Sequence, residues 1–152
     1  MRKYIIIVFF FITQISFGQS DKITRNELIE NFKRKDSYVQ KWITCNNDST
    51  FYKSDTLHFY KGLNYNRCKK YIIWEFDNSK SFYQVSGENF NHYDGINIIT
   101  DNDRYKMKIV EQENQILFNI YKHNIIVESF IVYELEYNEK EKWNRLTLIR
   151  KK

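Results

Sequence analysis

Short runs of β-branched and aromatic residues fill the chain from Ser37 to its C-terminus, and clusters of polar turn residues separate them. Such residues are enriched in strands, and short runs at regular spacing are typical of all-β domains. The links between the runs are too short for the crossover that a parallel pair requires, so we expect antiparallel pairing. The predicted strands lie near residues 38–45, 55–60, 69–77, 81–86, 95–100, 104–110, 115–121, 125–136 and 145–150.

Strand count and closure decide the fold class. The segment 125–136 is long enough to bend or bulge, so the count is eight or nine. Many short strands in a meander form a sandwich or a closed barrel, and closure removes the edges that strands without proline protect poorly. The sequence contains no proline. We therefore expect an all-β antiparallel meander closed into a barrel, with a sandwich as the alternative.

One short helix is predicted before the strands, at about 24–35. Thr24 and Glu27 have the spacing of a capping box, in which each side chain satisfies a free backbone N–H. A helix of about three turns buries too little apolar surface to be stable alone, so it should pack against the sheet. Its apolar stripe consists of Leu28, Ile29 and Phe32.

Residues 1–18 have the pattern of a signal peptide. Two basic residues precede an unbroken apolar run, Tyr4–Ile12, and the small residues Ser16 and Gly18 suit cleavage after Gly18. The apolar run is shorter than the roughly 20 residues of a spanning helix, which disfavours a membrane anchor as the alternative. We therefore predict export to the periplasm or the exterior, with residues 19–152 forming a single domain.

The net charge argues against one class of partner. Removing residues 1–18 takes away two basic residues and no acidic ones, which lowers the formal net charge from +5 to +3. Basic residues form only short clusters, such as those at 33–35 and 151–152, whereas a nucleic-acid interface needs a longer basic stripe. We therefore predict no nucleic-acid partner. Since the one long apolar run lies within the predicted signal peptide, we also predict no membrane span in the mature chain.

A pair that closes the barrel is predicted from side-chain parity in the last strand. Leu146, Leu148 and Arg150 share one face, so the arginine should point inwards with the leucines. An inward guanidinium must satisfy its donors or stack on an aromatic ring. Since the first and last strands of a closed meander are neighbours, Arg150 is expected to lie across Trp42.

These two positions carry a resemblance to a known family. Trp42 in VQKWITC and Arg150 in LTLIRKK resemble the tryptophan and the basic residue that cover each other in lipocalins. The order of signal peptide, helix, meander and closing strand is similar to that of the small exported lipocalin-like barrels of Bacteroidetes. The sequence departs from lipocalins at Gln40, where they have a glycine. The resemblance implies an exported, non-enzymatic barrel that binds a small apolar molecule.

The barrel interior is the candidate ligand site. An eight-stranded barrel is wide enough to pack solid or to hold one small ligand, and aromatic residues at strand spacing also suit a filled core. Both alternatives stay open. The residues expected to point inwards are Leu57, Phe59, Trp74, Phe76, Tyr105, Met107, Phe118 and Tyr133.

The two cysteines, Cys45 and Cys68, test the strand order. An exported chain would ordinarily oxidise them to a disulfide. In a strict meander, however, Cys45 ends the first strand and Cys68 begins the third, about 20 Å away, whereas a bridge needs Cα atoms within about 7 Å. Either the cysteines are buried thiols, or they are bridged and the strand order differs.

No other set of residues indicates chemistry. His58, His92 and His123 lie on different segments without a second ligand at metal spacing, and no nucleophile motif is found. We predict no metal, no cofactor and no enzymatic activity.

The alternative function is a protein-interaction module of the inhibitor or immunity type. Its contacts would come from an outer sheet face or from the loops near 46–54 and 86–95. A carrier needs an empty apolar interior, whereas an interaction module needs a filled interior and an exposed aromatic patch.

Overall fold

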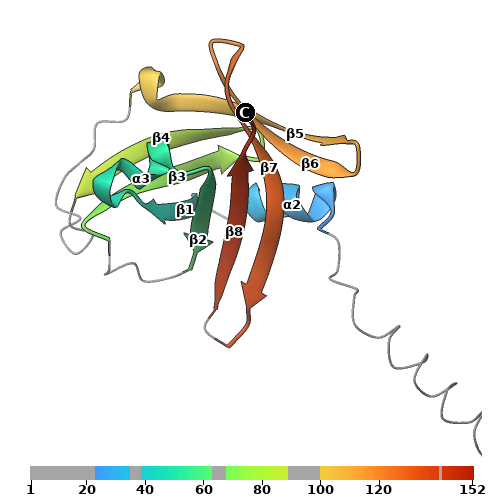
Figure 1. Cartoon of the computed structure of the whole chain (residues 1–152), viewed down its shortest axis with the longest axis horizontal. Coiled ribbons are helices and arrows are strands. Elements are labelled where there is room, and N and C mark those ends of the chain that lie inside the picture. Colours follow the sequence, from blue (N-terminus) through green and yellow to red (C-terminus); the bar gives the residue numbers. More distant parts are fainter. Residues whose placement is uncertain (1–22, 35–38, 63–67, 89–99, 141) are drawn as a thin grey trace, which may run out of the picture.

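Eight antiparallel strands form a closed barrel in the computed structural model (Figure 1). The structure describes residues 23–34, 39–62, 68–88, 100–140 and 142–152. The all-β barrel predicted from the sequence is therefore confirmed, although most of the predicted strand at 95–100 lies outside the described residues. The strands are β1 (Gln40–Cys45), β2 (Thr56–Lys61), β3 (Lys70–Asn78), β4 (Ser81–Glu88), β5 (Arg104–Gln112), β6 (Gln115–Lys122), β7 (Ile125–Asn138) and β8 (Trp143–Arg150).

The strand order departs from a meander at one point. Around the barrel the order is β1, β2, β8, β7, β6, β5, β4 and β3, so β1 lies between β2 and β3, and β8 pairs with β2. Because β1 is antiparallel to both of its neighbours, β2 and β3 run parallel to each other. The connecting residues 62–69 can extend about 26 Å, enough to return along a six-residue strand. The expectation that every link was too short for a crossover was wrong here.

A disulfide between Cys45 and Cys68 lies at this crossover. Cys45 ends β1 opposite Tyr71 of β3, and Cys68 stands just before β3 begins. The two Cα atoms are 5.3 Å apart. The structure therefore has the bridged alternative, together with the changed strand order that such a bridge requires.

Two helices cover opposite ends of the barrel. Helix α2 (Arg25–Phe32) starts with the predicted capping box and ends about three residues early, because Lys33 is already extended. The second helix, α3 (Thr50–Lys53), follows the short 3-10 helix η1 (Asn47–Ser49); a further 3-10 helix, η2 (Asp101–Asp103), precedes β5. Each helix is hydrogen-bonded to a different end of β8. Asn144, near the start of the strand, donates to Asn31 of α2, and Arg150, at its end, donates to the Phe51 carbonyl of α3. Among the described helices, none has the length and apolar character needed to cross a membrane.

Candidate binding sites

Aromatic side chains fill the barrel interior. The Phe59 and Phe118 rings stack on Trp74, with centroid distances of 4.0 and 5.6 Å. The indole N–H of Trp74 donates to Gln84 Oε1 at 3.0 Å, so the polar atom of this side chain is satisfied. Six residues predicted to line a ligand cavity are instead packed in this cluster, each at most 6% exposed: Leu57, Phe59, Trp74, Phe76, Met107 and Phe118.

Rings from both end helices complete the packing. Phe32 of α2 lies 4.5 Å from the Phe76 ring and 5.4 Å from the Phe118 ring, centroid to centroid. At the other end, Phe51 of α3 lies 6.2 Å from the Phe59 ring. Both Phe32 and Phe51 are almost completely buried. The two ends through which a ligand would enter a barrel are therefore covered by aromatic side chains, as the filled-core alternative requires.

Of the other two residues predicted to point inwards, Tyr105 packs against this core and Tyr133 does not. Tyr105 is partly buried, and its ring stacks on that of Phe82 with a centroid distance of 5.6 Å. Tyr133 is 67% exposed, so the prediction for it was wrong. The pairing of β7 with β8 shifts register between Val132 and Glu134. Tyr133 is therefore the extra residue of a bulge, so regular alternation does not predict to which face of the sheet its side chain points.

Trp42 and Arg150 do not form the predicted pair. Trp42 is fully buried, and the cation over its ring is Lys61 Nζ of β2, at 5.9 Å from the centroid. Arg150 lies over the Phe130 ring of β7, at 5.1 Å. The prediction was wrong because it assumed that β8 borders β1, whereas β2 lies between them.

Arg150 instead joins three elements at the α3 end of the barrel. Its Nη1 donates to Glu128 Oε1 at 2.7 Å, and its Nη2 donates to the Phe51 carbonyl oxygen at 2.8 Å. Charge-assisted bonds of this kind are stronger than neutral ones. The expectation that an inward arginine must find acceptors or an aromatic face holds, and its role here is to fix α3 over the barrel.

The remaining sequence candidates do not converge on one site. His58 Nδ1 lies 3.2 Å from Thr147 Oγ1, His123 lies in the β6–β7 turn, and His92 lies outside the described residues. No group of three or more His, Cys, Asp or Glu side chains in the described ranges could hold a metal ion. The predicted contact loop 46–54 is largely helical, and the loop 86–95 lies mostly outside the described residues.

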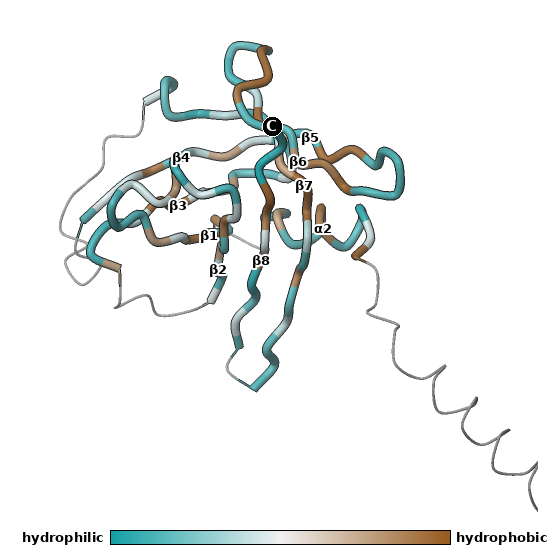
Figure 2. The backbone as a smooth tube through the Cα atoms, in the orientation of Figure 1, coloured by the Kyte–Doolittle hydropathy of each residue, from teal (hydrophilic) through white to brown (hydrophobic). Residues whose placement is uncertain are grey.

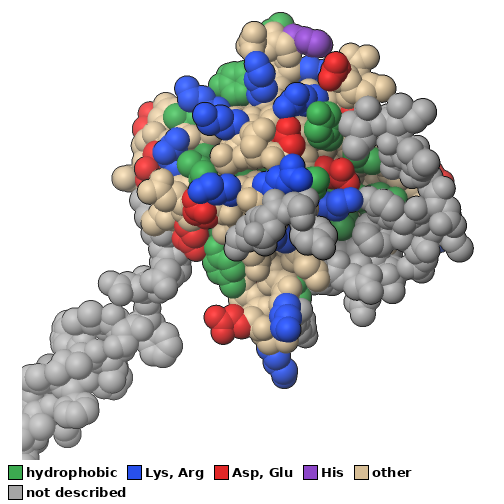
Figure 3. Space-filling view, turned by 180° about the vertical axis from the view of Figure 1, so that it is seen from behind, with side chains coloured by type: hydrophobic (Ala, Val, Ile, Leu, Met, Phe, Trp, Pro, Cys, Tyr) green, Lys and Arg blue, Asp and Glu red, His purple; other side chains and the backbone are tan. Residues whose placement is uncertain are grey.

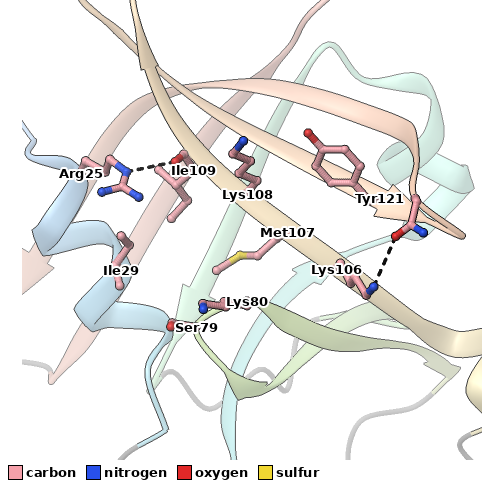
Figure 4. Close-up of a pocket in the computed structure, with 10 residues that line it drawn as sticks. Arg25, Ile29, Ser79, Lys80, Lys106, Met107, Lys108, Ile109 and Tyr121 are labelled. Atoms are coloured by element: carbon pink, nitrogen blue, oxygen red, sulfur yellow. Dashed lines mark hydrogen bonds between the residues drawn. The ribbon is translucent and has the colours of Figure 1, made fainter.

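A lateral cleft of about 520 Å³ opens where β5 separates from β4 (Figure 4). The two strands pair only from Ser81 to Tyr83, so most of β5 extends past the β3–β4 turn. Helix α2 packs along this part of β5, and Arg25 Nε donates to the Ile109 carbonyl oxygen at 3.0 Å. The cleft is lined by Arg25, Ile29, Ser79, Lys80, Lys106, Met107, Lys108, Ile109, Tyr121 and Asn124.

The β6–β7 hairpin projects from the barrel and carries exposed apolar residues. Ile125, Ile126 and Val127 are 69%, 53% and 46% exposed. Strand β8 ends opposite Phe130, so these three residues extend past it. Figure 2 shows the projecting loop with hydrophobic residues on it, and Figure 3 shows Lys and Arg side chains spread over the neighbouring surface. We call Ile125, Ile126 and Val127 the hairpin tip.

Comparison with known proteins identified no relative: no protein-family profile, no curated protein and no solved structure matches the chain.

Sequence reasoning missed both the cleft and the hairpin tip. Alternation with Met107 places Lys106 and Lys108 on the outer face of their strand, but nothing in the sequence shows that β5 extends past β4. The hairpin tip did give a signal. Three consecutive aliphatic residues directly after the His123–Asn124 turn break the alternation of a strand with one buried face.

Proposed function

We propose that this chain is an exported, non-enzymatic binding module that contacts a protein partner through its hairpin tip. Two features support export: residues 1–18 have the pattern of a signal peptide, and the Cys45–Cys68 disulfide suits an oxidising compartment. The resemblance to lipocalin-like barrels agrees with this location. The observation that carries the proposed function is a filled barrel with an exposed aliphatic tip.

The filled interior favours an interaction module over a carrier. A ligand within the barrel would have to displace Phe32 or Phe51 and then separate stacked rings around Trp74. Protein cores are close-packed, so each such displacement would leave a cavity or strain. The outer surface is therefore the better candidate for recognition.

The hairpin tip has the shape and chemistry of an insertion wedge. Successive strand residues point to opposite faces, so Ile125 and Ile126 present apolar surface on both sides. The His123–Asn124 turn has positive φ angles of 50° and 66°, which suits a tight two-residue hairpin. Burial of the exposed parts of three such side chains would contribute roughly 3 kcal/mol to binding. An apolar groove on the partner is the matching surface.

Nearby charges indicate the chemistry of the groove rim. Lys122 ends β6 next to the turn, and Lys106 Nζ contacts Asn124 Oδ1 at 3.3 Å. Glu128, at the base of the hairpin, is already paired with Arg150. The surroundings of the tip are therefore basic, and an acidic rim around an apolar groove would be complementary.

A site-specific photo-crosslinker tests the proposal in the native host. With the crosslinker at Ile126, we expect a discrete protein adduct that unlabelled wild-type protein competes away. The matched control places it at Lys140, which is exposed at the β7–β8 turn. Adding Ile125→Asp and Val127→Asp should abolish the Ile126 adduct while the far-UV spectrum and melting temperature stay unchanged. Adducts with lipid alone, or equal adducts from both positions, would refute a protein partner at the tip.

A further inference from the structure

We infer that the lateral cleft beside α2 binds an amphipathic anion, meaning an apolar chain with a phosphate or carboxylate head group. This site lies beside the hairpin and shares Lys106 with the basic surroundings of the tip, but it does not depend on the protein partner proposed there. The inference rests on a cleft of suitable size whose apolar floor adjoins lysines that have no carboxylate partner within the described residues. Its volume of about 520 Å³ falls within the range of small-molecule sites.

The floor of the cleft is apolar because core side chains at the edge of the barrel line it. Met107 and Ile109 point into the core from β5, and Ile29 of α2 packs beside them. Past Met107, whose N–H donates to the Lys80 carbonyl, β5 has no pairing with β4. The gap leaves these side chains as one wall that an alkyl chain could cover, with α2 as the opposite wall.

The rim carries four cations and no carboxylate. Arg25, Lys80, Lys106 and Lys108 line the cleft, and no Asp or Glu is among its lining residues. Figure 4 shows the three lysines arranged around Met107. Some cations elsewhere on the barrel pair with a carboxylate, as Arg104 does with Asp77. In contrast, the three cleft lysines have no carboxylate partner within the described residues.

An anion would relieve repulsion that the protein leaves uncompensated. Lys106 and Lys108 are two residues apart on one strand face, so their Cα atoms are separated by about 7 Å. A head group between them and Lys80 would accept charge-assisted hydrogen bonds. The adjacent floor of Met107 and Ile109 would take the apolar chain, which distinguishes such a ligand from a simple inorganic anion.

Isothermal titration calorimetry with decyl phosphate below its micellar concentration tests the site. We expect decyl phosphate to bind at least tenfold more tightly than inorganic phosphate or decanol. Inorganic phosphate lacks the alkyl chain, and decanol lacks the anionic head group. Affinity should fall as salt rises. The amide resonances of Met107 and Ile109 should shift on titration, which places the ligand in the cleft.

Matched charge variants separate a specific site from general attraction. Substituting Lys80, Lys106 and Lys108 with Gln should weaken decyl phosphate binding at least tenfold. The control set, Lys69→Gln, Lys140→Gln and Lys151→Gln, removes the same charge from exposed lysines outside the cleft and should change binding less than twofold. Equal weakening by both sets, or no binding of decyl phosphate to the wild type, would overturn the inference.

Two further measurements cover the floor and the source of the ligand. Ile29→Gln is expected to reduce the advantage of decyl phosphate over inorganic phosphate, because it makes one wall polar without burying a charge. If vesicles of phosphatidylglycerol displace decyl phosphate from the cleft, the head group is that of a lipid; if they do not, the natural ligand is a dispersed amphiphile. Sedimentation with these vesicles without any response to decyl phosphate would assign anion recognition to another surface and overturn the inference.

Discussion

Removal of the Cys45–Cys68 bridge should destabilise the barrel by an amount that the loop length sets. The cysteines are 23 residues apart, and closing a loop of this length in the unfolded chain corresponds to about 3.4 kcal/mol at 25 °C. A domain of this size usually has an unfolding free energy of about 5–15 kcal/mol. The double variant Cys45→Ala and Cys68→Ala should therefore fold, with a much lower urea midpoint.

Tryptophan fluorescence during urea unfolding measures the change. The wild type under reducing conditions is the matched control, because it loses the bridge but keeps both side chains. Agreement between the reduced wild type and the double variant would assign the effect to the bridge. We also expect a larger dependence of the unfolding free energy on urea, since the unbridged unfolded chain exposes more surface. A loss below about 1 kcal/mol would refute the loop-entropy reasoning, and unlinked cysteines in a non-reducing peptide map would refute the strand order.

Three other predictions concern single side chains. Trp42→Ala should destabilise the barrel by about 3–5 kcal/mol in the same assay, whereas Trp42→Phe should cost less, because it keeps an aromatic ring and removes an indole N–H that has no acceptor in the described structure. Arg150→Met should cost about 2 kcal/mol, because it leaves the Glu128 carboxylate without its partner; Arg150→Lys, which keeps the charge, should cost less. Burial and a hydrogen bond to Glu27 raise the pKa of Tyr137 to about 12. Its folded pKa therefore exceeds the unfolded value near 10, so its contribution to folding stability is complete below pH 10 and is lost as pH rises towards 12. Since Tyr137 is 45% exposed, solvent screening reduces this loss to about 1 kcal/mol. Tyr137→Phe should flatten the dependence of the unfolding free energy on pH in this window.

The sequence predicted the local elements well because local rules determine them. Thr24 and Glu27 fix the start of α2 through a capping box, and polar clusters separate the strands. The inward face of β5, with Met107 and Ile109, also follows directly from alternation. These features depend on residues close in sequence, where side-chain periodicity and turn chemistry are informative.

The strand order and the sites were harder to predict because they depend on long-range placement. Nothing near Trp42 shows that β2, with Lys61, would lie beside it in place of β8. The exposure of Tyr133 depends on a bulge that is visible only in the pairing of β7 with β8. The cleft exists because β5 extends past β4. The register between these two strands cannot be deduced from the sequence of either strand alone. The cysteines were the one long-range signal, since a bridge between them was incompatible with a meander.

The crossover of β2 has a consequence for the order in which the barrel can assemble. Strand β2 forms most of its pairing with β8, so it must wait for the last strand of the chain, whereas β3 to β8 pair with neighbours in sequence. Contacts of such long sequence separation form slowly, because a large loop must close before they are made. The Cys45–Cys68 bridge needs only β1 and β3, so it can form early and leave β2 as a tethered loop. We expect a partly assembled sheet with an oxidised bridge and an open seam between β2 and β8, which the final strand then closes.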